Sequence, residues 1–299
     1  MKSNICCYLL VLGCLSGCDL INPEEQLPIY VEVKDARVLV DEQRQTWSTL
    51  GIKDGWVFQQ NQMVGVFQMP STFPILLNEG VDSLRIGGGV FETGLSSFRL
   101  EYPFWDDVNV SLAGIEPLDT LVVRPRFRYF ERDSVLIYAF EEGFEGASVI
   151  LQSQQPTVKH TRIDPSTEDR FVGQFSGKVV FSPDRYIMEL SSPLLSLPQS
   201  GFNDIWCEVT YKNDIPFSVL LVGLAPGSVF EQELPTNVVF GSPDGWNTVY
   251  IHLNDLARSL SNGAAFKLVF RASSYDTQLQ QGRDGYLFLD HIRLIHFKS

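Results

Sequence analysis

The residue with the clearest chemical setting in this 299-residue chain is Cys18. It follows the small residues at the end of Leu15–Gly17, which close an apolar run over residues 5–15, and Lys2 precedes that run. A positive residue, a short apolar stretch and small residues before a cut site are the three parts of a secretory signal. We therefore predict cleavage before Cys18 and attachment of lipid, palmitate included, to its sulfur and its amine.

The four residues 15–18 resemble the lipobox of bacterial lipoproteins. The apolar run is too short to cross a membrane as a helix, which needs about 20 residues. Covalent acyl chains anchor a protein firmly because each buried CH₂ contributes about 0.8 kcal/mol. The sequence thus predicts a lipoprotein signal peptide at 1–17, a lipidated polar tether at 18–27, and a membrane reached through the lipid anchor.

Cysteine use agrees with that prediction. Of five cysteines, three leave with the signal and Cys18 carries lipid, so Cys207 is the one thiol of the mature chain. An intramolecular disulfide is then excluded, and the fold must be held by its core. Cys207 alternates with Ile205, Val209 and Tyr211 along a predicted strand, which favours a small buried apolar residue over a nucleophile.

Length and charge narrow the classes of protein further. Removal of 17 residues from 299 leaves 282, a length typical of two domains. The formal net charge of −13 argues against nucleic acid as a partner. The same charge argues against binding to an anionic lipid surface by electrostatics alone, so the lipid would do the anchoring.

The order of apolar and turn residues predicts an all-β protein of two β-sandwich domains. In residues 28–127, short alternating runs are separated by Gly, Pro and Asn, as in the hairpin expected around Gln60–Gln62. Residues 128–299 hold about ten further strands, and one short helix is expected near 254–260. Two packed sheets without a helical layer are typical of a jelly roll.

The first domain resembles the PEGA-type, prealbumin-like or Ig-like small sandwiches. The resemblance covers Trp56 to Gly87 and lies in Gly65 after the hairpin, Pro70 after the next strand and Gly80 before the following one. A wider pattern, which includes Phe73–Leu76 and Tyr102–Trp105, resembles a family of uncharacterised Bacteroidota outer-membrane lipoproteins. That resemblance implies lipid anchoring in the outer membrane and carries no activity. Exposure at the cell surface and a periplasmic position both stay open.

The second domain resembles the galactose-binding-like jelly rolls of carbohydrate-binding modules. The segments that carry the resemblance are Phe144–Gly146, Gly173–Gly177, Gly245–Asn254, Phe266–Ala272 and Gly285–Leu294. The resemblance implies a structural Ca²⁺ between an early Glu and the Asp of the last strand. Calcium favours several carboxylate and carbonyl oxygens.

The positions that match this metal site are Glu145 or Glu142, together with Asp290. Asp290 shares a strand face with Phe288 and Ile292, so a buried charge there needs a partner. The alternative to calcium is a carboxylate that accepts backbone N–H groups at the end of the sheet.

No constellation for catalysis is found in the sequence. It contains no H-E-x-x-H, G-x-S-x-G or P-loop pattern, and an acid and base pair of carboxylates cannot be recognised without their separation. We therefore expect no enzyme. Candidate ligand-binding residues are the large aromatics Trp206 and Trp246 in the jelly roll, and Trp105 beside two aspartates, although for Trp105 we favour the alternative that it caps the first core.

The sequence accordingly predicts a non-catalytic outer-membrane lipoprotein with a binding or scaffold role at the cell envelope. One version is glycan binding by the jelly roll. The alternative is an accessory subunit of an outer-membrane assembly, secretion or uptake complex. A glycan-active hydrolase is the third reading.

Overall fold

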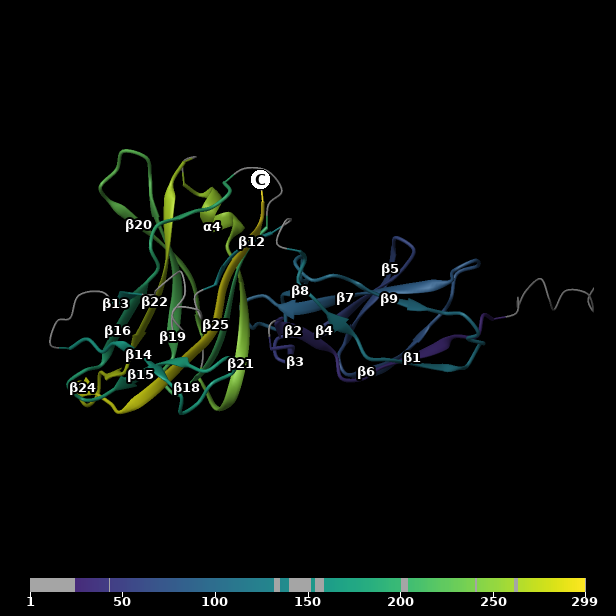
Figure 1. Ribbon diagram of the computed structural model, residues 1–299, viewed down its shortest axis with the longest axis horizontal. Helices are drawn as coiled ribbons and strands as arrows, with labels where there is room; N and C mark the ends of the chain where they lie inside the picture. The colour runs from purple at the N-terminus through teal and green to yellow at the C-terminus, as the bar shows by residue number, and fades with distance from the viewer. Residues whose placement is uncertain are drawn as a thin grey trace, which may run out of the picture.

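The computed structural model describes residues 25–42, 44–131, 135–139, 152–153, 159–199, 204–239, 241–260 and 263–298. Cys18, Glu142 and Glu145 lie outside these residues. Two bodies of β-strands lie side by side along the long axis, and β1 (Ile29–Val33) lies in the body drawn at the right (Figure 1). The all-β class with packed sandwiches, which the sequence predicts, is confirmed.

The smaller body, which we call the first sandwich, is built from three sheets. Their strand orders are β10-β1-β6, β11-β2-β3 and β5-β4-β7-β8, with β9 also paired to β7. The other strands of this body are β2 (Arg37–Asp41), β3 (Thr46–Ser48), β4 (Asp54–Gln59), β5 (Gln62–Gln68), β6 (Ser71–Ile75), β7 (Ser83–Phe91), β8 (Arg99–Glu101), β9 (Val108–Ser111), β10 (Thr120–Val123) and β11 (Arg126–Phe127). The expected hairpin is present between β4 and β5.

The larger body is a jelly roll of two sheets. The front sheet runs β14-β15-β25-β18-β21, with β12 on β25; the back sheet runs β13-β16-β22-β19-β20, with β17 on β22. Front-sheet strands are β12 (Val135–Ala139), β14 (Ile163–Ser166), β15 (Ser176–Phe181), β18 (Ile205–Asn213), β21 (Ser242–His252) and β25 (Gly285–Phe297). Back-sheet strands are β13 (Gln152–Ser153), β16 (Ile187–Ser191), β17 (Leu195–Ser196), β19 (Phe217–Leu224), β20 (Glu231–Val239) and β22 (Ala265–Ser273).

Two elements stand apart from the sheets of the jelly roll. The strand β23 (Tyr275–Asp276) pairs with β24 (Gln281–Gly282) in a two-stranded ribbon, and the helix α4 (Asn254–Arg258) follows β21. The helix lies within the range that the sequence predicts, and it has no side-chain cap; the Asn254 side chain instead accepts the N–H of Ile205 at 2.6 Å. In the part of the chain that the structure describes, no helix is long and apolar enough to cross a membrane.

Strand alternation places the jelly-roll core between its two sheets. On β18, Ile205, Cys207, Val209 and Tyr211 all join the inner core cluster, as the sequence pattern predicts. Burial raises the pKa of the Cys207 thiol, so this cysteine is a core residue and not a reactive one. The intervening side chains of β18 face outward, on the side of the front sheet away from this core.

Candidate functional site

The outer face of the front sheet is divided into two halves. At one half, Trp206 of β18, Tyr250 of β21 and Ile295 of β25 join the core cluster of the first sandwich. Tyr102 contacts Trp206 edge-on at 5.4 Å between ring centroids and Tyr250 at 5.0 Å. The first sandwich therefore covers this half of the face.

A buried carboxylate lies in the covered half. Glu208 of β18 is fully buried and accepts hydrogen bonds from the hydroxyls of Tyr102 and, at 2.8 Å, Tyr129. Burial raises the pKa of Glu208, while Arg293 and the two hydroxyls oppose that rise. His291 Nε2 lies 3.8 Å from Glu208, and burial together with Arg293 holds the His291 pKa well below its usual range.

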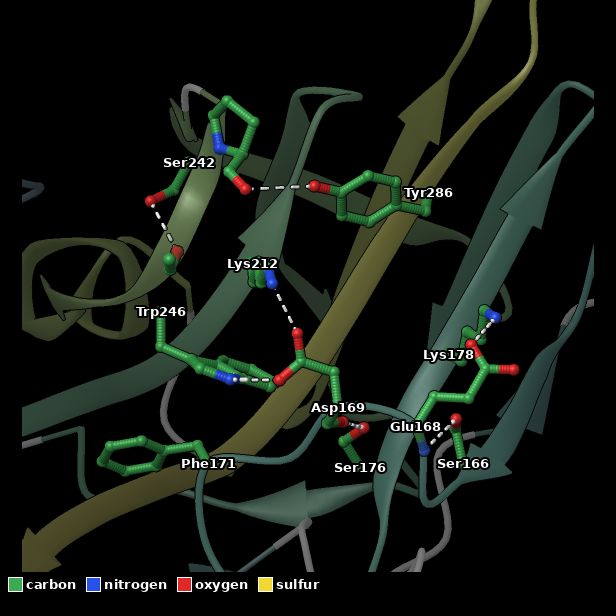
Figure 2. Close-up of polar contacts among 12 residues, drawn as sticks. Ser166, Glu168, Asp169, Phe171, Ser176, Lys178, Lys212, Ser242, Trp246 and Tyr286 are labelled. Carbon is green, nitrogen blue, oxygen red and sulfur yellow. Dashed lines mark hydrogen bonds and ion pairs between the residues drawn. The ribbon is translucent and has the colours of Figure 1, made fainter.

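The other half of the outer face carries a group of aromatic and charged side chains, which we call the Trp246 patch. Its members, drawn in part in Figure 2, are Asp169, Lys178, Lys212, Trp246, Tyr286 and Phe288. They come from β15, β18, β21, β25 and the segment between β14 and β15. The patch is thus built on four strands of one sheet.

Asp169 fixes the centre of the patch. One carboxylate oxygen accepts a hydrogen bond from the indole N–H of Trp246 at 2.9 Å, and the other accepts one from the Lys212 ammonium at 2.5 Å (Figure 2). Partial burial alone would raise the pKa of Asp169, but the hydrogen bonds from Lys212 and Trp246 outweigh it and lower that pKa. The half-buried indole is therefore held in one orientation by an ionised carboxylate.

Aromatic rings continue the patch across β25. Phe288 lies 6.3 Å from Trp246 and 5.6 Å from Tyr286 between ring centroids. The Lys178 ammonium lies 5.6 Å from the centre of the Phe288 ring and pairs with Glu168. Trp246 and Tyr286 are half-buried and Phe288 lies buried beside them. Partly exposed rings beside fixed donors and acceptors form a surface that can contact both the apolar and the polar parts of a ligand.

Asp290 anchors the segment that carries Asp169. One of its carboxylate oxygens accepts the N–H groups of Phe171 at 2.8 Å and Val172 at 3.2 Å, and the other accepts the N–H of His291 at 2.7 Å. This environment matches the alternative to calcium that the sequence left open. Across the described ranges, no group of three His, Cys, Asp or Glu side chains could hold a metal.

The other two metal candidates, Glu142 and Glu145, lie outside the described residues, so calcium binding at these positions stays a prediction.

The structure separates the three predicted ligand-binding tryptophans. Trp246 is half-buried in the patch, whereas Trp105 and Trp206 are 3% and 2% exposed in the cluster between the two bodies. Their burial agrees with the alternative in which Trp105 caps a core. Sequence reasoning missed Asp169 and Lys212, because the only local signal was a charged residue on an alternating strand or in a turn.

No protein-family model matches the sequence, and no curated protein matches it. Solved structures that match include one described as a study of promiscuous specificity in carbohydrate-binding modules of the β-sandwich superfamily, at 12% identity and a TM-score of 0.39 over 91% of this chain and 99% of that one.

Two further matches cover about half of the chain. The CBM22-1 xylan-binding domain from Paenibacillus barcinonensis has 14% identity and a TM-score of 0.37 over 55% of this chain and 94% of that one. A family 11 carbohydrate-binding module from Clostridium thermocellum has 11% identity and a TM-score of 0.35 over 55% and 96%. At such values the matches carry no argument about what this chain binds, so its function must be argued from the site.

Proposed function

We propose that the jelly roll binds a glycan at the Trp246 patch. The observation that carries the proposal is the half-buried indole of Trp246, whose N–H is bonded to Asp169 and whose neighbours are further rings and lysines. A sugar ring presents apolar C–H faces and a rim of hydroxyls. Such a ligand suits a partly exposed aromatic ring that is bordered by fixed hydrogen-bonding groups.

The rigidity of the patch favours binding of this kind. Asp169 belongs to a segment that Asp290 holds by two backbone N–H groups, and the remaining members stand on paired strands. Side chains that are already ordered lose little conformational entropy when a ligand arrives. The patch therefore needs no rearrangement to present its rings.

Replacement of Trp246 by alanine is expected to lower affinity for the bound glycan about 10- to 100-fold, because a central aromatic anchor commonly contributes most to binding. A glycan array with residues 28–299 would identify the ligand, and calorimetry would give both affinities. The matched control is Trp47→Ala, a half-buried tryptophan on the first sandwich that stacks near Arg128. Equal affinities of the wild type and Trp246→Ala would contradict the proposal.

We further propose that lipid on Cys18 holds the protein to the outer membrane, as in the Bacteroidota lipoproteins that the sequence resembles. A Cys18→Ala variant should then fail to incorporate labelled palmitate and should leave the membrane fraction, because its acyl anchor is missing. The measurement is fractionation beside metabolic labelling. A variant that fractionates like the wild type, or a wild type without label, would end this proposal.

Binding without catalysis is the role we favour for the jelly roll. The carboxylates of the patch are engaged with lysines, and Asp169 is held ionised rather than poised as an acid. The accessory role in an outer-membrane complex remains an alternative prediction, tested by crosslinking in membranes. Recovery of the protein alone would count against that alternative.

A further inference from the structure

A crevice lies where the first sandwich meets the edge strand β21. Its volume is about 210 Å³, below the range of about 300–1,000 Å³ that is common for drug-sized ligands, so it suits one ring-sized group. Residues from both bodies line it, namely Gly51, Lys53, Phe91 and Gly94 from the first sandwich, and Asn247, Thr248 and Tyr250 from β21. A ligand in the crevice would therefore contact both bodies at once.

One glycine and two backbone hydrogen bonds shape the crevice. A Cβ atom on Gly51 would lie 2.4 Å from the Tyr250 ring, so only glycine allows this approach. The N–H of Thr93 donates to the Tyr250 carbonyl at 2.7 Å, and the N–H of Lys53 donates to the Gly89 carbonyl at 2.9 Å. Main-chain hydrogen bonds thus hold both the first-sandwich side and the β21 side of the crevice in place.

Lys53 differs from the lysines of the Trp246 patch. Lys212 and Lys178 are each paired with a carboxylate of the protein, whereas Lys53 has no ion pair within 4.0 Å among the described residues. Its ammonium lies 6.0 Å from the centre of the Phe91 ring. Of these three lysines, Lys53 is the one whose charge is available to an anionic ligand.

The carboxylates nearest to Lys53 form their closest contacts with other groups. The neighbouring Asp54 is fully buried and accepts from Arg99 at 2.6 Å, and Glu92 faces His252 at 3.9 Å. Asp54 attracts the Lys53 ammonium through space, but no ion pair within 4.0 Å joins Lys53 to either carboxylate. An ammonium beside aromatic rings and a threonine hydroxyl can bind a carboxylate or sulfate group on a ring-shaped ligand.

The crevice and the Trp246 patch share the strand β21. Thr248 lies two residues beyond Trp246 on the same face of β21, a step of about 7 Å along a strand. The Thr248 hydroxyl lies 2.8 Å from that of Thr210, which belongs to the adjacent strand β18. A chain of sugars on Trp246 would reach the crevice with its next units.

We propose that the crevice is a second subsite, specific for an acidic sugar of the glycan, with Lys53 as the residue that binds its carboxylate or sulfate. The inference rests on the proposed function of the Trp246 patch. The first sandwich then contributes to ligand selection and is not only a spacer.

The first test compares acidic oligosaccharides on the glycan array with neutral ones of the same linkage. The intact protein purified in detergent should bind the acidic members about tenfold more tightly, as expected for one hydrogen bond to a charged group. Lys53→Met should remove that preference and leave neutral affinity within about twofold of the wild type. Lys267→Met, which alters a lysine paired with Glu231 on the back sheet, is the matched control.

The second test does not depend on the Trp246 patch. Glucuronate and glucose, as monosaccharides, are titrated into ¹⁵N-labelled protein, and the amide signals of Gly51, Gly94 and Thr248 are followed. Glucuronate alone should shift them, and Lys53→Met should abolish the shift. Equal shifts with both sugars, no shift with either, or a preference that survives Lys53→Met would overturn the inference, whereas unchanged glycan binding by Trp246→Ala would overturn the proposed function.

Discussion

Replacing Trp206 with alanine is expected to lower the free energy of unfolding by about 3–5 kcal/mol, the usual cost of deleting a large aromatic side chain from a core. Trp206 is 2% exposed between the two bodies, with His252 stacked on it at 4.7 Å and Tyr102 against its edge. The cavity could not collapse easily, since paired strands hold both sides. Urea unfolding gives the free energy.

The control for this prediction is Trp47→Ala. Unlike Trp206, Trp47 is only half-buried and lies on the surface of the first sandwich, beside Arg126 and Arg128. Its loss should cost about 1 kcal/mol or less, as for most surface positions. A cost that small for Trp206→Ala as well would mean that the two bodies do not share a core.

Alternation along the strands could be predicted because it depends on the chain alone. The inward set on β18, from Ile205 to Tyr211, follows directly from the period of two residues. The same reasoning gives the hairpin around Gln60 and the burial of Cys207. These features need no knowledge of which strand lies beside which.

The covering of the outer face could not be predicted in this way. On an alternating strand Glu208 has the pattern of a solvent-facing residue, yet it is fully buried beneath Tyr102, which lies 106 residues earlier in the chain. No feature of the sequence near Glu208 indicates its contact with Tyr102. Trp206 has the same outward position on β18, and the sequence therefore predicted it as a ligand-binding residue. The surface that covers Trp206 belongs to the first sandwich, which is distant in the sequence.

The candidate site was predictable only in its most visible member. Trp246 stood out as a large aromatic in a polar surrounding, but Asp169 lies 77 residues away and Lys212 on a different strand. Their meeting depends on strand order in the front sheet, which runs β14-β15-β25-β18-β21. Lys53 comes from the other body altogether, and its role depends on the way in which the two bodies meet.

The hydrogen-bonded Glu208 leads to a prediction with a definite pH dependence. Burial raises the pKa of Glu208 in the folded state above its usual value, so the folded state holds this proton more tightly than the unfolded state does. The stability that this group contributes is fully present below the unfolded pKa and is lost as pH rises through the folded pKa. Ionised Glu208 then depends on the hydroxyls of Tyr102 and Tyr129.

Tyr102→Phe is therefore expected to cost about 1.5–3 kcal/mol at the alkaline end of a pH series, where a hydrogen bond to a charged group is lost, and less at its acid end. In a Glu208→Gln background the same substitution should cost only about 0.5–1.5 kcal/mol, the value for a neutral hydrogen bond, at both ends of the series. Urea unfolding of the four proteins at each pH completes a double-mutant cycle. His291 lies 3.8 Å from Glu208 and its pKa is lowered as well, so the pH dependence of the cycle belongs to Glu208 and His291 together. A Tyr102→Phe cost that is the same at both ends of the series, with and without Glu208→Gln, would show that Glu208 is not the ionised acceptor at this interface.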